Sequence, residues 1–247
     1  TITAFGDGVT LDPATVQLHV SYDNGPVQTI TMDDVGSDEF SATFPAGDCY
    51  ANVDYWYTAQ DTDGRTFKTP WNAPTSPFVA TIATDQQTPI NDTFETDLGW
   101  LSTGDATTGL WERGVPINAG DGGPEHDGDG SGQCYVTGNE ANRSVNGGAA
   151  EVISPAIDLS NAEQAFVSYW RYLSVAFGSG QIRVDASDDD GATWHQIEAS
   201  TSNTPDWLKK RYRLNDFIDL TSTVRIRFTA QDVSPLAVTE AGVGGVR

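Results

Sequence analysis

Cysteine, cationic side chains and long apolar runs are all scarce in this chain of 247 residues. Only two cysteines are present, Cys49 and Cys134, and this number excludes a framework of several disulfides. One bridge between them and two separate thiols both stay open, because a free cysteine behaves as a small hydrophobe. No run reaches the ~20 apolar residues of a membrane span, so membrane insertion is not expected.

Positively charged side chains are also scarce. The chain has 13 Lys and Arg against 35 Asp and Glu, for a net charge of -22. Such a chain repels nucleic acid and anionic membranes, and neither is expected as a partner. The carboxylates can keep a protein soluble in salt or supply oxygen ligands for calcium, and both interpretations stay open. No charged-then-apolar leader opens the chain, so if the parent protein is secreted this sequence is a mature or trimmed piece.

Helix signals are nearly missing, whereas alternation of apolar and polar residues recurs between turn formers. "VQLHVSY" and "NVDYWYTAQD" alternate with a period of two, and each is followed by a turn sequence. Several short strands of this kind predict an all-β fold with a small immunoglobulin- or fibronectin-like sandwich over residues 1–84. The polar, unpatterned residues 85–90 are expected to be a linker.

A longer all-β region follows, over residues 91–247. Roughly nine or ten strand patterns over this length predict a larger β-sandwich of the jelly-roll type. The clearest pattern is "TVRIRFTAQD", which places Val224, Ile226 and Phe228 on one face and the intervening side chains on the other. The predicted architecture is therefore two sandwiches in series.

Catalytic patterns are missing from the chain. It has three histidines and neither an H-E-x-x-H nor a G-x-S-x-G motif, so neither a zinc peptidase nor a serine hydrolase is indicated. A carboxylate pair of the kind that hydrolyses glycosides stays open as an alternative, because 35 acids make a chance pairing easy. The sequence predicts no enzyme in this region, although the parent protein is free to carry a catalytic domain upstream.

The stretch "SDDDGATWHQI" resembles the Asp-box turn of sialidases through Ser187, Asp189, Gly191 and Trp194. In that family the motif recurs in successive propeller blades, away from the catalytic residues. Here it occurs once, in a chain too short for a six-bladed propeller. Its serine, aspartate and glycine are turn formers, so we interpret it as the hairpin between "QIRVDAS" and "WHQIEAS", with Trp194 folded over the turn.

A glycine- and aspartate-rich run, "GPEHDGDGSGQCYVTGN", is a second candidate site. Asp127, Asp129 and Ser131 imitate the start of an EF-hand loop, but Gly138 stands at the twelfth position, where that loop needs a bidentate glutamate. An EF-hand is therefore not expected. A cation loop of other geometry and an ordinary acidic loop both stay open.

The order of several motifs in the second region resembles a known family. "NDTFETDLGW", "TTGLWERGVP", "EVISPAIDLS" and "VRIRFTAQDV" together resemble the MAM-like, concanavalin-type jelly-roll modules of secreted bacterial multidomain proteins. Residues 1–82 look like the fibronectin type III or immunoglobulin-like module that often precedes them. The resemblance implies a non-catalytic accessory region of a secreted or cell-surface protein, serving adhesion, assembly or substrate targeting beside other domains of the same parent.

The same resemblance implies a structural calcium ion where the first strand meets the last. Asp92 and Glu95 match the family's acids at the first strand, whereas Gly244 and Gly245 stand where two aspartates are expected. Loss of two carboxylates weakens a calcium site, because affinity follows ligand charge. The acids that would compensate are Asp127, Asp129 and Glu240.

Three alternatives to an adhesion or assembly role remain. A carbohydrate-binding module would stack sugar rings on exposed aromatic side chains, for which the candidates are Trp170, Tyr172 and Trp207. Trp170 and Tyr172 lie in a strand pattern with apolar neighbours, and Trp207 is expected in a loop. The other two are a glycoside hydrolase with a carboxylate pair and a filament-forming structural surface protein.

Overall fold

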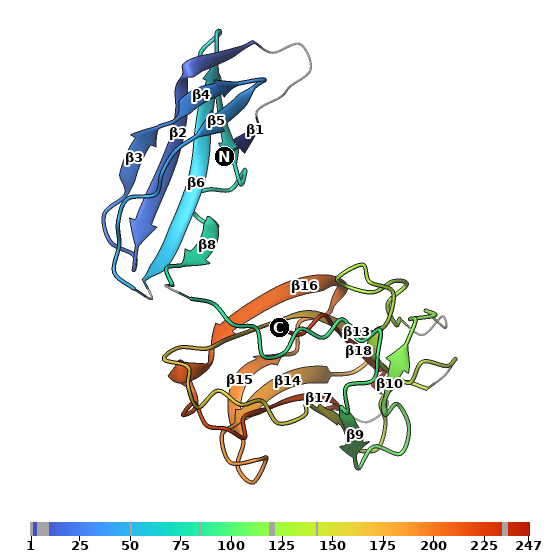
Figure 1. The fold of residues 1–247 in the computed structure, drawn as a ribbon. Coiled ribbons are helices and arrows are strands. Elements are labelled where there is room, and N and C mark those ends of the chain that lie inside the picture. The colour runs from blue at the N-terminus through green and yellow to red at the C-terminus, as the bar shows by residue number, and fades with distance from the viewer. Residues whose placement is uncertain are drawn as a thin grey trace. The chain divides into compact units, whose positions relative to one another are not determined.

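A computed structural model describes residues 2–3, 10–49, 51–83, 85–118, 122–141, 143–233 and 237–247. Antiparallel strands dominate these residues, and their one helix is a single 3-10 turn, Leu214–Asp216. The predicted all-β class is therefore confirmed. The chain divides into two compact units, residues 1–86 and 87–247, drawn in Figure 1. Within the described residues, no helix has the length and apolar character needed to cross a membrane.

The first unit is a small sandwich. Its larger sheet has the order β3-β2-β6-β7 with β8 also paired to β6, and its smaller sheet has the order β1-β5-β4. Val16, Leu18, Val20, Phe40 and Val53 form most of its buried core. Its strands are β1 Ile2–Thr3, β2 Leu11–Tyr22, β3 Gln28–Thr31, β4 Asp33–Gly36, β5 Glu39–Ser41, β6 Asn52–Asp61, β7 Thr66–Thr69 and β8 Phe78–Thr81.

The second unit is a larger sandwich of two five-stranded sheets. One sheet has the order β10-β11-β18-β13-β16 and the other β15-β14-β17-β12-β9. These strands are β9 Leu101–Gly104, β10 Trp111–Gly114, β11 Cys134–Thr137, β12 Ala149–Ile153, β13 Phe166–Val175, β14 Gly180–Ser187, β15 His195–Ser200, β16 Thr204–Arg213, β17 Arg225–Asp232 and β18 Thr239–Gly244.

Alternation along the strands sorts side chains between the core and the outer faces of this sandwich. On β13, Val167, Tyr169 and Leu173 point into the core and contact residues of the other sheet, such as Phe228. The intervening positions of β13 therefore point outward, on the opposite face of the same sheet. This face, called the outer face below, carries the candidate site.

The structure differs from the sequence interpretation at Trp207, which lies within strand β16 rather than in a loop. The proline at position 205 obscured this strand, because proline lacks the N–H that a central strand donates. Strand β16 is the last strand of its sheet, where a proline is tolerated. Trp207 thereby faces outward beside β13.

Candidate functional site

Part of the outer face is covered by residues 122–133, which run between β10 and β11. The indole Nε1 of Trp207 donates a hydrogen bond to the His126 carbonyl at 2.7 Å, and the Tyr172 hydroxyl donates to the Gly122 carbonyl at 2.8 Å. Beneath this segment, Trp207 and Tyr172 pack with Cys134 into a small apolar cluster. The aromatic residues of the face thus anchor the segment that covers them.

The covering segment limits how much of the three predicted stacking residues is exposed to solvent. Trp207 is 8% exposed and Tyr172 is 6% exposed, so little of either ring reaches solvent. Trp170 is half-buried and packs against the same cluster. None of the three presents a fully open ring, and their predicted role in stacking sugars stays a prediction.

A pocket of about 260 Å³ opens beside the covering segment. Trp207 and Tyr172 form part of its wall, and the carboxylates of Glu125 and Asp206 lie at its rim. Polar groups surround an aromatic wall there, which is the usual composition of a small-molecule site. The pocket is lined by Asn118, Gly122, Gly123, Pro124, Glu125, His126, Tyr172, Ser174, Pro205, Asp206 and Trp207.

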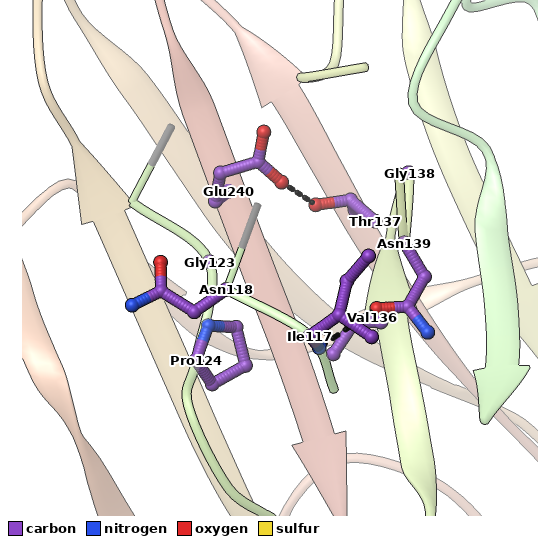
Figure 2. Close-up of a pocket in the computed structure, with 9 residues that line it drawn as sticks. All are labelled: Ile117, Asn118, Gly123, Pro124, Val136, Thr137, Gly138, Asn139 and Glu240. Carbon is purple, nitrogen blue, oxygen red and sulfur yellow. Dashed lines mark hydrogen bonds between the residues drawn. The ribbon is translucent and has the colours of Figure 1, made fainter. Parts of the chain in front are cut away.

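A second, much smaller hollow shares Asn118, Gly123 and Pro124 with this pocket. Figure 2 shows Glu240 beside Thr137, whose hydroxyl donates to a Glu240 carboxylate oxygen at 2.9 Å. The free volume is about 10 Å³, which is about the space of one water molecule. Because Glu240 is only 2% exposed and shares its carboxylate with Thr137, we interpret this hollow as structural.

The acidic loop brings Asp127 and Asp129 into contact around Ser131. Asp127 Oδ2 accepts from the amide and the hydroxyl of Ser131 at 3.0 and 2.9 Å, and Asp129 Oδ1 accepts from the same amide at 3.0 Å. The Ser131 hydroxyl also lies 3.0 Å from the Thr93 carbonyl. Asp127 Oδ1 is buried and has no hydrogen-bond partner. Burial, and next the contact with Asp129, raise the pKa of Asp127.

Gly244 and Gly245 make room for these two acids. A β carbon at position 244 would lie 2.6 Å from Asp127 Oδ1, and one at position 245 would lie 2.4 Å from Asp129 Oδ2. Both distances are shorter than atoms tolerate without displacement. Gly244 and Gly245 therefore accompany acids that enter the same space from another loop.

The five predicted metal ligands do not form one cluster. Asp92 uses both oxygens within the protein, accepting from the Phe94 amide at 2.7 Å and from Trp100 Nε1 at 2.8 Å. Glu95 accepts from the Gln133 amide at 2.6 Å. Glu240 lies four residues from Gly244 along β18, roughly 13 Å away at the usual strand rise. Within the described ranges, no group of three or more His, Cys, Asp or Glu side chains is placed to hold a metal.

The Asp-box stretch forms the turn between β14 and β15. Ser187 Oγ donates to Asp189 Oδ1 at 2.8 Å and accepts from the Gly191 amide at 2.8 Å. Asp189 also accepts from the amide and the hydroxyl of Thr193 at 2.8 and 2.7 Å. Trp194 is half-buried, with the Arg227 guanidinium 4.3 Å from its ring centre. Each of these contacts is internal to the turn or its neighbouring strand.

The turn has a predictable response to acid. Hydrogen bonds from the backbone and side chain of Thr193, then from Ser187, lower the pKa of Asp189 to about 2 from an ordinary 3.8. A depressed pKa stabilises the fold above the ordinary value, and this contribution is lost as the pH falls from about 4 through about 2. We expect Asp189→Asn to flatten that part of the stability profile, measured by denaturation at a series of pH values. An unchanged profile would contradict this.

The cysteines are two separate thiols. Cys134 is buried beneath the covering segment and Cys49 is exposed. Burial is the main cause that raises the pKa of Cys134, which keeps it a neutral thiol. A bridge between the two is therefore not formed in this structure.

Comparison with known proteins places the chain only by architecture. No protein-family model matches it, and no curated protein sequence matches it. Among solved structures, an adhesin domain of Lys-gingipain from Porphyromonas gingivalis is 17% identical with a TM-score of 0.45, covering 65% of this chain and 96% of that one.

Two carbohydrate-binding modules are similar to the same degree. TmCBM61, solved with β-1,4-galactotriose, is 15% identical with a TM-score of 0.40, covering 60% of this chain and 86% of that one. A family 11 module from Clostridium thermocellum, solved with a β-1,3-1,4-mixed-linked tetrasaccharide, is 12% identical with a TM-score of 0.41, covering 63% and 91%. At these identities the likeness concerns the β-sandwich alone.

The rim of the larger pocket was not anticipated from the sequence. Glu125 and Asp206 are 81 positions apart in the chain, and each is surrounded by ordinary loop or turn residues. The hydrogen bond from Trp207 to the His126 carbonyl and the packing of the Trp207 ring beside Gly128 bring their segments together. The one usable signal was the alternation in "WLKKRYR", which puts Trp207 on the same face as Lys209 and Arg211.

Proposed function

We propose that the second unit is a non-catalytic glycan-binding module, within an accessory region of a secreted or cell-surface protein. The observation that carries the proposal is the pocket of about 260 Å³ on the outer face, with an aromatic wall and a polar rim. Sugars offer many hydroxyl groups and weakly polar ring faces. A site that combines carboxylate acceptors with aromatic edges complements both.

The rim carboxylates are the groups that would select a sugar. Glu125 Oε1 accepts a hydrogen bond from Asn118 at 2.8 Å, and Asp206 Oδ1 accepts from the amide of Trp207 at 2.8 Å. In each case a neighbour fixes one oxygen and so orients a carboxylate that lines the pocket. A carboxylate held in this way accepts strongly from a sugar hydroxyl, because hydrogen bonds to a charged acceptor are the stronger kind.

Binding can be measured by calorimetry against a panel of neutral polysaccharides that includes β-1,4-galactan and mixed-linked β-glucan. We expect Glu125→Ala and Asp206→Ala each to weaken binding about tenfold, corresponding to one lost charge-assisted hydrogen bond. Glu163→Ala is the matched control, because Glu163 is an exposed acid just before the opposite end of β13. Failure of the unmodified protein to bind any neutral glycan would refute the proposal.

The same two acids would be the carboxylate pair of the alternative function, a glycoside hydrolase. Both Glu125 and Asp206 are exposed, whereas the general acid of a glycosidase is held in an apolar environment that favours its protonated form. The acids therefore fit binding better than hydrolysis. Release of reducing ends from any panel member, abolished by Glu125→Gln or Asp206→Asn, would replace the binding module with a glycoside hydrolase.

A bound calcium ion belongs to the proposal as a stabilising element. The residues that fit it are Asp127 and Asp129, since Asp127 Oδ1 is a buried oxygen without a partner and the two carboxylates repel one another. The Thr93 carbonyl and the Ser131 hydroxyl lie beside them. Oxygen donors of this kind suit Ca²⁺, and the ion would offset the repulsion.

Calcium dependence is tested by thermal unfolding of the chain in chelator and in excess Ca²⁺. At a hundredfold excess over the dissociation constant, binding stabilises by about 2.7 kcal/mol, which corresponds to a rise of roughly 5 to 10 °C. We expect Asp127→Asn with Asp129→Asn to remove the rise, and Asp158→Asn, an exposed acid elsewhere, to keep it. An equal midpoint with and without calcium would refute the ion.

A further inference from the structure

Cationic side chains gather on the outer face along β16, beginning two residues after the pocket residue Trp207. Strand β16 pairs with β13 so that Lys209 lies opposite Trp170, Arg211 opposite Ser168 and Arg213 opposite Phe166. Directly paired residues of antiparallel strands share a face. Since Trp170 and Phe166 alternate with the core residues Val167 and Tyr169, all of these side chains face outward.

A fourth cation joins them from the other side of β13. Arg247 exchanges two backbone hydrogen bonds with Ser168, at 2.8 and 2.9 Å, and so stands on the same face as Ser168. Four of the 13 cationic residues thus share one part of one sheet. We call this set the cationic strip, made of Lys209, Arg211, Arg213 and Arg247 over the rings of Phe166 and Trp170.

The rings hold two of the charges in place. The Arg211 guanidinium lies 4.0 Å from the centre of the Phe166 ring, and Lys209 Nζ lies 5.8 Å from the centre of the Trp170 ring. Both cations are exposed at their residue level. Within the described part of the chain Lys209 forms no ion pair, while Arg213 pairs with Asp216 at 3.4 Å. Arg247 lies close enough to Asp129 for its charge to lower the pKa of that carboxyl. Two of the four cations therefore have an acid nearby, and four cations against these two acids leave the strip locally positive in a chain whose net charge is -22.

We propose that the cationic strip binds the carboxylate or sulfate groups of an anionic polysaccharide. The proposal goes beyond the neutral-glycan pocket proposed above, because it adds a second ligand class on other residues of the same face. A guanidinium presents a planar fork that matches carboxylate and sulfate geometry, and a ring beside it offers an apolar surface to a sugar. Lys209 and Arg211 are two residues apart, roughly 7 Å along the strand, so neighbouring charges of a polymer can engage both.

The large negative charge of the chain does not prevent this contact. At physiological ionic strength, charges are screened beyond about 8 Å, so a ligand on the strip experiences mainly the strip itself. Distant acids then lower the rate of encounter more than the strength of the complex. Nucleic acid, which carries a dense and regular charge, gains less from so small a patch and suffers the same repulsion.

Protection of a sheet edge is the simpler role for these cations. Strand β16 is the last strand of its sheet, and lysine on such a strand discourages pairing with other chains. Edge protection accounts for Lys209 and Arg211 but needs neither ring. It also gives no reason for Arg247, which extends β18 on the interior side of β13. Complementary charge over aromatic rings accounts for Lys209 and Arg211 together with the rings beneath them.

The test measures binding of the chain by affinity electrophoresis and calorimetry to polygalacturonate, to a sulfated carrageenan and to a neutral β-1,4-galactan. The first two separate carboxylate from sulfate as the recognised group. We expect Lys209→Ala or Arg211→Ala to weaken anionic binding roughly 3- to 10-fold, since each removes one exposed ionic contact. Lys209→Glu with Arg211→Glu is expected to abolish it. The matched control is Arg65→Glu with Arg143→Glu, two exposed cations outside the strip.

The outcomes separate this inference from the proposed function. Loss of anionic binding in the double strip variant, with neutral binding and thermal unfolding unchanged, supports the strip. Anionic binding that is missing in the unmodified protein, survives the double strip variant or falls equally in the control overturns it. Equal affinity for single-stranded DNA also overturns it, because the strip would then bind any polyanion and not specifically an anionic polysaccharide. Loss of neutral binding in Glu125→Ala and Asp206→Ala reports on the pocket independently.

Discussion

Replacing Glu198 with alanine is expected to lower the free energy of unfolding by about 3 to 5 kcal/mol. Glu198 lies on β15, 8% exposed, and joins the two sheets of the second unit. Its Oε1 lies 3.1 Å from Nε of Arg171, which is 3% exposed on β13, and its Oε2 accepts from the Tyr169 hydroxyl at 2.7 Å. Without Glu198 the arginine keeps its charge but loses the partner that offsets its burial.

The surrounding groups strengthen this expectation. Burial, together with the Glu198 charge, raises the pKa of Tyr169, so its hydroxyl stays protonated and needs an acceptor. Lys210 Nζ lies 3.7 Å from the same carboxylate and retains access to water. The alanine variant thus removes the carboxylate that offsets a buried cation and leaves one buried hydroxyl without its acceptor.

Denaturant unfolding of Glu198→Ala measures the loss, with Glu163→Ala as the exposed-acid control. The double change Glu198→Leu with Arg171→Met is expected to recover much of it, because replacing both members of a buried pair by apolar groups removes the uncompensated charge. A single alanine variant as stable as the unmodified chain would show that Arg171 finds another partner or reaches water.

Replacing Asp92 with alanine is expected to lower the free energy of unfolding by about 3 to 6 kcal/mol, even in chelator. Asp92 is 2% exposed and pairs with Val246 through two backbone hydrogen bonds of 2.9 and 2.8 Å, joining the start of the second unit to its last strand. Its side chain holds the amide of Phe94, whose φ is 62°, and the indole of Trp100. Two donors to a charged acceptor are lost together, at roughly 1.5 to 3 kcal/mol for each such bond before any relaxation.

Asp92→Asn separates this role from metal binding. The asparagine oxygen can accept from Phe94, but its amide group then meets the Trp100 donor, so about half of the loss is expected. Thermal unfolding of both variants with and without calcium measures the difference. A cost that appears only when calcium is present would show that Asp92 is a metal ligand, as the family resemblance implies, rather than an anchor for Trp100.

Alternation alone was enough to find most strands. "NVDYWYTAQD" corresponds to β6 and "QIRVDAS" to all but the first residue of β14, because polar and apolar residues largely alternate in these two sequences. Alternation did not identify the strand position of a residue close to a proline. Trp207 lies two residues after a proline and was expected in a loop, whereas it lies within β16.

The candidate sites could not be located from the sequence alone, because they depend on contacts between residues far apart in the chain. Asp127 and Asp129 were visible as an acidic run, but only the close approach of Gly244 and Gly245 shows why two acids fit there. The pocket depends on a hydrogen bond between residues 81 positions apart. The cationic strip needs three strands in register, and register over such separations is set by packing rather than by local sequence.

The sequence by itself determined the all-β class, the scarcity of catalytic motifs and the turn at Ser187 to Trp194, because these depend on periodicity and on local hydrogen bonding. Tertiary structure alone decided which aromatic rings are covered, that Asp92 and Glu240 are held by neighbours within the protein, and where cations gather in an acidic chain. The physical reason is that burial and charge proximity are properties of pairs brought together by folding, and the identity of either member alone does not contain them.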